Sequence, residues 1–421
     1  MTHNLAYSKI FRFRNLAWLA FLAAAPVLCA ARAPFPQKNA PAAVFARTQT
    51  GVDVLEAEKF APLRGLRVGV ITNQTGVDSQ GRRTIDLLAH TPGVKLVAIF
   101  SPEHGIAGLA DADVSNGTDA PTGLPIYSLY GATRHPTDAM LEHLDALVFD
   151  IQDAGVRFYT FTTTMAYCME AAAQHHIAFF VLDRPDPLGG QVIEGPMLDP
   201  GRTSFVGYFP MPVRYAMTLG ELAEMFNAEN KIGAALHVIP MKNWRREETY
   251  SQTGLAWIAP SPNLRNLNAA LLYPGIEILQ DGGVSVGRGT DAPFEIFGAP
   301  WIHAAEFVAA LNLRKIPGVD FAPAQFTPDD GLYKGRVCQG ATISITGRAA
   351  LRPMYMGLVI ADELHRMYPD QFQLGKIIGL LGSQSTLDRL QRGDDPEQIV
   401  DGWKADLAKF AAMRDKYLLY K

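Results

Sequence analysis

Three short apolar segments, each ending in a group of charged residues, limit most strongly what this chain can fold into. Residues 94–100, 146–149 and 178–182 are strand-like and apolar along nearly their whole length, as expected for buried strands. Pro-Glu-His-Gly closely follows the first segment, Asp-Ile-Gln-Asp the second and Asp-Arg-Pro-Asp the third. Open α/β sheets bind ligands at the carboxyl ends of their strands. The three segments therefore predict a buried parallel sheet with a polar site at one edge.

Helical segments alternate with strands along the first half of the chain. We expect strands at 65–72, 94–100, 146–150, 178–182 and 236–240, and helices at 52–60, 84–90, 138–144, 163–175 and 218–230. Thr218 and Glu221 form a capping box that marks the start of the last of these helices. This alternation predicts an α/β fold, a Rossmann-like doubly wound parallel sheet.

The pattern changes after about residue 300. We expect helices at 302–312, 354–367 and within 386–420, and strands at 319–327 and 341–346. This pattern of helices and strands predicts a second, smaller α+β domain packed against the first. We expect the Rossmann-like domain to span residues 51–300 and the smaller domain residues 301–421, with 241–300 rich in loops.

The N-terminal residues have the pattern of an export signal. Basic residues precede the apolar stretch 16–28, and small residues follow it, so residues 1–33 are expected to form a signal peptide. Residues 34–50 are rich in alanine and proline and resemble an exposed linker. We expect a periplasmic or secreted protein; lipid anchoring through Cys29 is less favoured because Leu28 stands where a small residue is needed. No later segment is long and apolar enough to span a membrane.

Charge and motif content exclude several classes of partner. The formal net charge is −4 at pH 7, which argues against a nucleic-acid partner. No His, Cys, Asp and Glu cluster has metal-site spacing, and residues 287–290 lack the context of a dinucleotide fingerprint, so we expect no metal and no cofactor. Cys168 and Cys338 follow the leader, and the sequence does not require a disulfide between them.

Glu103 is the strongest candidate for a catalytic group. It follows a proline just beyond a predicted strand, and His104 and a glycine come directly after it. An isolated glutamate in such a loop is more often an ordinary surface carboxylate. The charged residues at the neighbouring strand ends change that balance, and we interpret Glu103 as a general acid.

Other candidate residues follow the remaining strands or lie in the loops between 241 and 300. They are Asn73, Asp153, Arg157, Tyr159, Arg184, Glu194, Asn263, Arg288 and Thr290. Arginine pairs with carboxylates bidentately, and tyrosine offers a phenol. Structural alternatives exist: Asp153 could cap a turn or pair with Arg157, and Arg184 could merely shape its own loop.

Five motifs together resemble one known family. They are Phe-Ser-Pro-Glu-His-Gly at 100–105, Asp-Ile-Gln-Asp-Ala-Gly-Val-Arg-Phe-Tyr-Thr at 150–160, Asp-Arg-Pro at 183–185, Pro-Ser-Pro-Asn at 260–263 and Ser-Val-Gly-Arg-Gly-Thr at 285–290. In this order they resemble the exo-β-N-acetylmuramidase (NamZ-like) family of peptidoglycan hydrolases, from about residue 50 to the C-terminus.

The resemblance implies release of N-acetylmuramic acid from the non-reducing end of peptidoglycan fragments, either disaccharides or muropeptides. It also implies an active site in the cleft between a Rossmann-like domain and a smaller domain. The family's proposed catalytic glutamate corresponds to Glu103, and a nearby tyrosine corresponds to Tyr159.

Glycoside hydrolysis needs a proton donor and a second group that supports the positive charge on the sugar. Asp153 is the candidate second carboxylate, with Glu194 in reserve, but the acetamido oxygen of the substrate is an equal alternative. The lactyl carboxylate of muramic acid needs a cation, for which we expect Arg157 or Arg288.

Two other classes of protein remain as alternatives. A periplasmic binding protein for cell-wall sugars, without catalysis, also has two α/β lobes, but its lobes are normally alike. An esterase or amidase acting on cell-wall peptides is disfavoured because the chain lacks a Gly-x-Ser-x-Gly elbow and a metal site.

Overall fold

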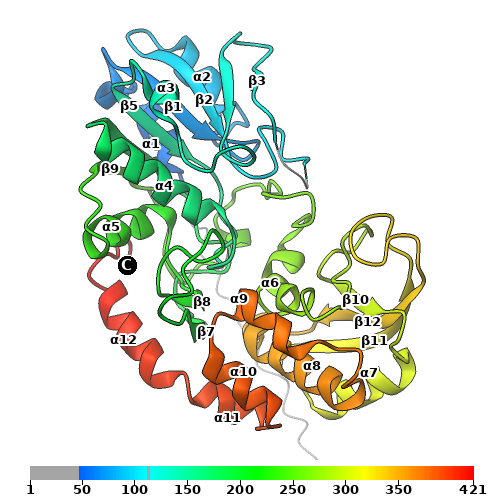
Figure 1. Cartoon of the computed structure of the whole chain (residues 1–421). Helices are drawn as coiled ribbons and strands as arrows, with labels where there is room; N and C mark the ends of the chain where they lie inside the picture. Colours follow the sequence, from blue (N-terminus) through cyan, green and yellow to red (C-terminus); the bar gives the residue numbers. More distant parts are fainter. Residues whose placement is uncertain (1–46, 111–113) are drawn as a thin grey trace, which may run out of the picture. The chain divides into compact units, whose positions relative to one another are not determined.

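The computed structural model describes residues 47–110 and 114–421 (Figure 1). The expected signal peptide and most of the expected linker lie outside the described residues. The last residues of that linker belong to the fold, because the Thr48 amide donates to the carbonyl of Thr253 and Gln49 bridges to Lys242. Thr48 and Thr50 are buried, whereas Arg47 and Gln49 are exposed.

The first domain is built on a seven-stranded sheet. Its strands are β1 (Arg67–Thr72), β2 (Lys95–Ser101), β3 (Gly117–Thr118), β4 (Pro125–Ser128), β5 (Ala146–Asp150), β6 (Ala178–Leu182) and β9 (Ala235–Ile239). The spatial order is β3-β4-β2-β1-β5-β6-β9, and every pair is parallel except β3 with β4. The predicted doubly wound parallel sheet is confirmed.

Helices cover both faces of this sheet. They are α1 (Gly51–Ala57), α2 (Thr84–His90), α3 (Asp138–Leu141), α4 (Phe161–Gln174) and α5 (Leu219–Glu229). Side chains of a strand alternate between faces, so Val148 packs with α1 and α2 while Leu147 and Phe149 pack with α4 and α5. The predicted capping box of Thr218 and Glu221 is confirmed at the start of α5.

The sheet reverses its strand order next to β1. The chain runs from β1 outward to β2 and β4, then returns to β5 on the other side of β1. Such a switch point leaves a crevice at the carboxyl ends of the two central strands. The segments after β1, β2, β5 and β6 therefore begin at one edge of the sheet, as the sequence predicted.

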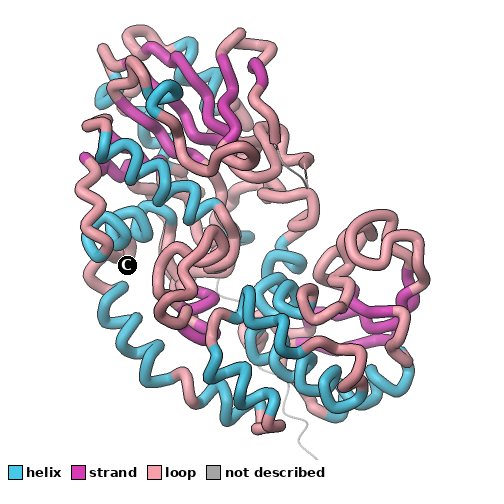
Figure 2. Tube along the Cα trace, in the orientation of Figure 1, coloured by secondary structure: helices cyan, strands magenta, loops and turns pink. Residues whose placement is uncertain are grey.

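The second domain combines a three-stranded antiparallel sheet with helices. Its strands are β10 (Ile296–Ala299), β11 (Val319–Phe326) and β12 (Cys338–Ile345), and its helices include α6 (Leu267–Ile276), α7 (Ala304–Leu313) and α8 (Pro353–Met367). Strand β10 pairs with β12, and α6 packs on α8. Helix α6 and strand β10, which precede the expected boundary at residue 300, pack with elements that follow it. The stretch between β9 and α6 is mostly loop, as expected (Figure 2).

Helices α6 and α8 approach each other closely at two glycines, one in each helix. A Cβ atom on Gly275 would lie 1.9 Å from the carbonyl oxygen of Pro353, and one on Gly357 would lie 2.3 Å from the carbonyl oxygen of Gly275. No larger residue fits at either position without moving the backbone. This contact holds α6 against the second domain, and α6 in turn contributes to the pocket described below.

The remaining elements lie between those already described or follow α8. They are β7 (Glu194–Met197), β8 (Pro212–Arg214), α9 (Ile378–Leu381), α10 (Gln384–Gln391), α11 (Pro396–Asp401), α12 (Lys404–Arg414) and four short 3-10 helices, η1 (Ala61–Leu63), η2 (Tyr250–Gln252), η3 (Glu277–Leu279) and η4 (Leu374–Ile377). After α12, the Tyr420 hydroxyl donates to Asp183 Oδ2 over 2.6 Å and the Leu419 amide donates to Glu221 Oε1 over 2.9 Å. No helix within residues 47–110 and 114–421 combines the length and apolar character that a membrane crossing needs.

Candidate active site

A pocket of about 630 Å³ is lined by loops of the first domain and by elements of the second. Five of the predicted site residues line it, and they are Glu103, His104, Tyr159, Asn263 and Arg288. These residues come from segments up to 185 positions apart in the sequence, so the fold brings them together. The predicted site is thus partly assembled around one pocket, with Glu103 on its wall.

Glu103 is held in place by the segment after β5. It lies just beyond the end of β2, and its Oε2 accepts a hydrogen bond from the hydroxyl of Thr160, the residue that precedes α4. This bond leaves Oε1 as the oxygen that can carry a proton. The arrangement suits a proton donor, because a fixed carboxyl group is presented at the pocket wall.

His104 makes the turn that presents Glu103. Its backbone is left-handed, with φ of 70°, a conformation that side chains other than glycine rarely adopt. Its Nδ1 lies 2.7 Å from the carbonyl oxygen of Ala110, and because a carbonyl oxygen can only accept, Nδ1 is the donor in this hydrogen bond. The turn and this bond fix both the backbone and the ring beside Glu103.

Tyr159 forms part of the pocket wall with an aromatic group around it. Its ring lies edge-on to Phe161 and to Tyr273, with centroid distances of 4.8 Å and 6.0 Å. Burial raises the pKa of Tyr159 well above its ordinary value, and the nearby carboxylates of Asp153 and Glu103 act in the same direction. The phenol is therefore a hydrogen-bond donor at any physiological pH.

Asp153 does not line the pocket. It is buried, and its Oδ2 accepts hydrogen bonds from the amide of Gly155 at 2.7 Å and from the hydroxyl of Tyr215. Burial raises the pKa of Asp153 to about 6, although these hydrogen bonds lower it. The expected second carboxylate is thus buried, is hydrogen-bonded within the protein, and does not line the pocket.

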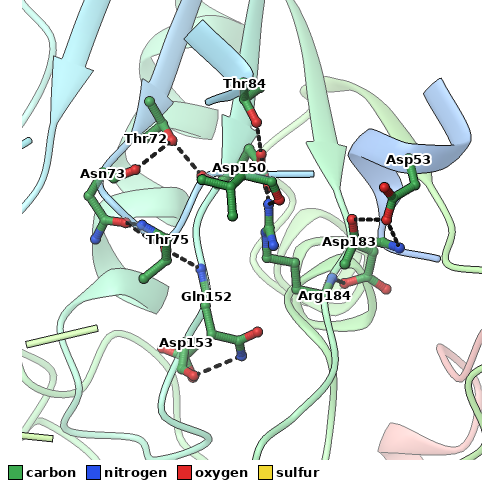
Figure 3. A network of polar contacts seen from close by, with 12 residues as sticks. Asp53, Thr72, Asn73, Thr75, Thr84, Asp150, Gln152, Asp153, Asp183 and Arg184 are labelled. Carbon is green, nitrogen blue, oxygen red and sulfur yellow. Dashed lines mark hydrogen bonds and ion pairs between the residues drawn. The ribbon is translucent and has the colours of Figure 1, made fainter. Parts of the chain in front are cut away.

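Asn73 and Arg184 follow β1 and β6 and belong to a network of polar contacts (Figure 3), and neither lines the pocket. Asn73 Oδ1 accepts hydrogen bonds from the amide and the hydroxyl of Thr75. Arg184 is buried and pairs with Asp150 through Nε at 2.6 Å, and Asp150 also accepts from the hydroxyl of Thr84. Their expected role in substrate binding is contradicted, because these side chains order the strand ends among themselves.

Arg157 is the largest departure from the sequence-based expectation. Its side chain is only 1% exposed, and its guanidinium donates to the backbone carbonyls of Pro196, Met211, Leu380 and Leu381 at 2.8–3.0 Å. Burial lowers the pKa of Arg157. The expectation that it binds a substrate carboxylate is therefore wrong: its donors tie the first domain to helix α9.

Glu194 and Thr290 also have structural positions outside the pocket. Glu194 Oε1 accepts from the amides of Met354 and Tyr355 at 3.0 Å and 3.1 Å, so it caps the start of α8, where amide groups lack helical partners. Thr290 donates to the carbonyl of Gly287 over 2.6 Å and shapes its own loop. Glu194 is thus not a reserve catalytic carboxylate, and Thr290 positions the loop that carries its neighbour Arg288.

Arg288 lines the pocket, and hydrogen bonds to other side chains hold its guanidinium. Its guanidinium donates to Glu277 at 2.7 Å and to Gln280 at 3.0 Å, and it lies 5.3 Å from the ring centroid of Phe294. The glycine at 289 has φ of 73°, and a Cβ there would lie 2.4 Å from the amide nitrogen of Asp330. The glycines beside Arg288 therefore allow close approach of another loop of the chain.

Several pocket residues were not identified from the sequence. They are Thr160, Ser261, Arg265, Tyr273, Glu277, Gln280, Asp329 and Asp330. Thr160 directly follows Tyr159 in the same motif, so the sequence offered a reason to include it among the candidate site residues. Tyr273 and Glu277 were missed because α6 contains Pro274 and a uniformly apolar sequence, which do not give a helical period.

The described residues contain no group of three or more His, Cys, Asp or Glu side chains that could hold a metal ion. Cys168 and Cys338 are both buried and are not joined by a disulfide. The side chains that line the pocket include carboxylates, an imidazole, phenols and guanidinium groups.

Comparison with known families covers almost all the described chain. Residues 68–268 match the family model described as exo-beta-N-acetylmuramidase NamZ, N-terminal, and residues 271–420 match the corresponding C-terminal model. The junction between the two models coincides with the start of the second domain at α6.

Individual relatives agree with the family models. The chain is 41% identical over 379 residues to the peptidoglycan beta-N-acetylmuramidase NamZ of Bacillus subtilis (strain 168), covering 89% of this chain and 92% of that protein. Two crystal structures of DUF1343 family proteins from Bacteroides fragilis NCTC 9343 are also similar. One has a TM-score of 0.83 at 40% identity and the other 0.72 at 30% identity, each covering 89% of this chain and 99% of the other.

Proposed function

This chain belongs to the exo-β-N-acetylmuramidase NamZ family and is a glycoside hydrolase, and from this premise we propose that it releases N-acetylmuramic acid from the non-reducing end of peptidoglycan fragments. The observation that carries the proposal is the position of Glu103 in the pocket lined by both domains. Because the family models meet at the domain junction, both walls of that pocket belong to the matched sequence.

Glu103 acts in this proposal as the general acid. The glycosidic oxygen of the leaving sugar gains a proton from Oε1, while the hydroxyl of Thr160 holds Oε2. Protonation allows the bond to break as positive charge develops at the anomeric carbon. His104, Asn263 and Arg288 contact the sugar from the same wall.

The second group in this proposal comes from the substrate. Asp153 is buried away from the pocket, and Glu194 caps α8, so neither expected carboxylate faces a bound sugar. The acetamido oxygen of muramic acid can attack the anomeric carbon instead, and the protonated phenol of Tyr159 donates a hydrogen bond that orients this amide. The route predicts retention of anomeric configuration in the released sugar.

The decisive experiment uses two chromogenic substrates. Purified protein is incubated with a 4-nitrophenyl N-acetyl-β-muramide and with the matching N-acetyl-β-glucosaminide, and released nitrophenol is followed by absorbance. Release from the muramide alone supports the proposal. Calorimetric binding of N-acetylmuramic acid without release from either substrate would instead support a sugar-binding protein, which the family membership does not favour.

We also propose that the chain is exported, which would bring it to its substrate. The support is the signal-peptide pattern of residues 1–33 alone.

A further inference from the structure

We infer that Arg265 reads the lactyl carboxylate of N-acetylmuramic acid and determines the preference for that sugar. This inference rests on the proposed function, because it names a contact within the same pocket. Two arginines, Arg265 and Arg288, line that pocket among the described residues. The environments of these two side chains decide which of them can accept a new anionic partner.

Arg288 is surrounded by negative charge and polar partners. It donates to Glu277 at 2.7 Å, and the side chain of Glu277 is only 9% exposed. Gln280 and the ring of Phe294 hold the same guanidinium. An ion pair that is shielded from water is strong and is broken only at high cost, so a substrate carboxylate does not displace Glu277.

The backbone beside Arg288 lies against an acidic loop. The amide of Asp329 donates to the carbonyl of Gly289 over 2.8 Å, and Asp329 and Asp330 both line the pocket. A second anion placed at this wall would be repelled by these carboxylates. The acidic loop therefore directs an anionic substituent toward a different part of the pocket.

Arg265 meets the requirement for a carboxylate receptor. It follows the Pro-Ser-Pro-Asn segment, and its guanidinium donates from Nε to the carbonyl of Pro262 over 3.2 Å. Its ion pair is with Asp291 at 3.5 Å, whose side chain is fully exposed, and the Arg265 side chain is about half exposed. Such a pair is weak in water, so the guanidinium can direct the N–H groups at its edge to a substrate carboxylate.

The geometry of the Pro262 contact favours this role. The bond from Nε to its own loop restricts the rotation of the long side chain, so less conformational entropy is lost on binding. Bidentate pairing of guanidinium and carboxylate then gives both affinity and orientation. A glucosaminide lacks the lactyl group and gains nothing from this contact.

The test compares two muramides that differ only in charge. One is the 4-nitrophenyl N-acetyl-β-muramide, and the other is its lactyl carboxamide, in which the carboxylate is replaced by a neutral amide of similar shape. We expect the wild-type protein to prefer the acid, and Arg265→Met to lower kcat/KM for the acid about tenfold, mainly through KM. The same variant should change kcat/KM for the amide by less than about twofold.

Three further variants make the result specific. Arg265→Lys keeps the positive charge but loses the planar guanidinium that pairs bidentately with a carboxylate. This variant should keep part of the preference for the acid. Asp291→Asn removes the competing carboxylate and should lower KM for the acid only. Arg392→Met is the matched control, because Arg392 is an exposed arginine paired with Asp394 and lies outside the pocket; it should leave both substrates unaffected.

Clear outcomes overturn the inference. If Arg265→Met reduces activity on both muramides equally, or retains the preference for the acid, Arg265 does not read the carboxylate, while hydrolysis of the muramides still upholds the proposed function. If the wild-type protein hydrolyses neither muramide, the proposed function fails and the inference fails with it.

Discussion

The hydroxyl of Thr160 donates a hydrogen bond to Oε2 of Glu103, joining the residue before α4 to the loop that follows β2. The two residues lie 57 positions apart in the sequence, and each comes from the end of a different strand–loop segment. The bond fixes Oε2, and in the proposed mechanism Oε1 is the oxygen that gives its proton to the leaving group. The first two predictions follow from this pair.

Glu103→Gln should abolish proton donation while keeping the shape of the side chain. We expect kcat for the muramide to fall by about 10²- to 10⁴-fold, the usual contribution of general acid catalysis. The thermal midpoint of unfolding should stay close to that of the wild type, and calorimetry should still detect binding of N-acetylmuramic acid. A rate near that of the wild type would exclude Glu103 as the acid.

Thr160→Val removes the hydroxyl and preserves the volume of the side chain. The Glu103 carboxyl group then loses its fixed orientation, and we expect kcat to fall about tenfold with little change in KM, as for loss of a hydrogen bond to a charged group. Thr160→Ser should restore most of the activity. A rate near that of the wild type in Thr160→Val would show that the hydroxyl does not position Glu103.

Arg157→Met should affect stability and not substrate recognition. Four carbonyl oxygens lose their donors in the interior, and we expect the free energy of unfolding to fall by about 3–5 kcal/mol. Urea denaturation measures this loss, and assays well below the unfolding transition should give an unchanged KM. A raised KM at unchanged stability would return Arg157 to a role in binding substrate.

Asp153→Asn should alter how stability depends on pH. In the folded protein the pKa of Asp153 is raised to about 6 by burial, from an ordinary value of 3.8. Between these two values the folded state binds more protons than the unfolded state, so this group makes stability fall as pH rises from about 4 to about 6. The asparagine cannot ionise and removes this contribution.

We therefore expect Asp153→Asn to become more stable relative to the wild type as the pH rises across that range. The gain in its relative free energy of unfolding should be on the order of 3 kcal/mol. Denaturation in urea at several pH values provides the measurement. Asp370→Asn is the control, since Asp370 is exposed, and its difference from the wild type should stay flat. A flat difference for Asp153→Asn as well would show that burial does not perturb this carboxyl group.

Expression in a bacterial host with an intact export pathway tests the N-terminal signal. We expect the exported protein to begin near residue 34, because residues 1–33 have the pattern of a cleaved leader. N-terminal sequencing and intact mass measure the cleavage site. A lipid-modified N-terminus at Cys29 would favour anchoring instead, and an uncut cytoplasmic chain would contradict export.

The regular part of the fold could be predicted from local patterns. Strands β5 and β6 begin and end where their apolar runs do, and Thr218 with Glu221 marks the start of α5 by a bond that involves only neighbouring residues. Helix α6 and strand β10 could not be found this way. Pro274 interrupts the helical pattern of α6, and the formation of β10 depends on pairing with β12, far along the chain.

The same distinction applies to the site. Glu103, His104 and Tyr159 were identified because their chemistry and their place after a strand are both visible in the sequence. The sequence does not show where a long side chain ends, so Arg157 could be expected in the pocket although its guanidinium is held by carbonyls of distant segments. Arg265 shows the converse, since its surroundings and not its motif make it available to an anion.

The contacts of Tyr420 and Leu419 with the first domain constrain how the molecule is made. A ribosome delivers the chain from its N-terminus, and domains generally fold as they emerge. Asp183, which follows β6, and Glu221 in α5 receive hydrogen bonds from residues that are synthesised 237 and 198 positions later. The polar interior of the first domain is therefore completed only when nearly the whole chain is present. The pocket, whose lining extends to Leu380, likewise cannot be complete until that part of the chain has been made.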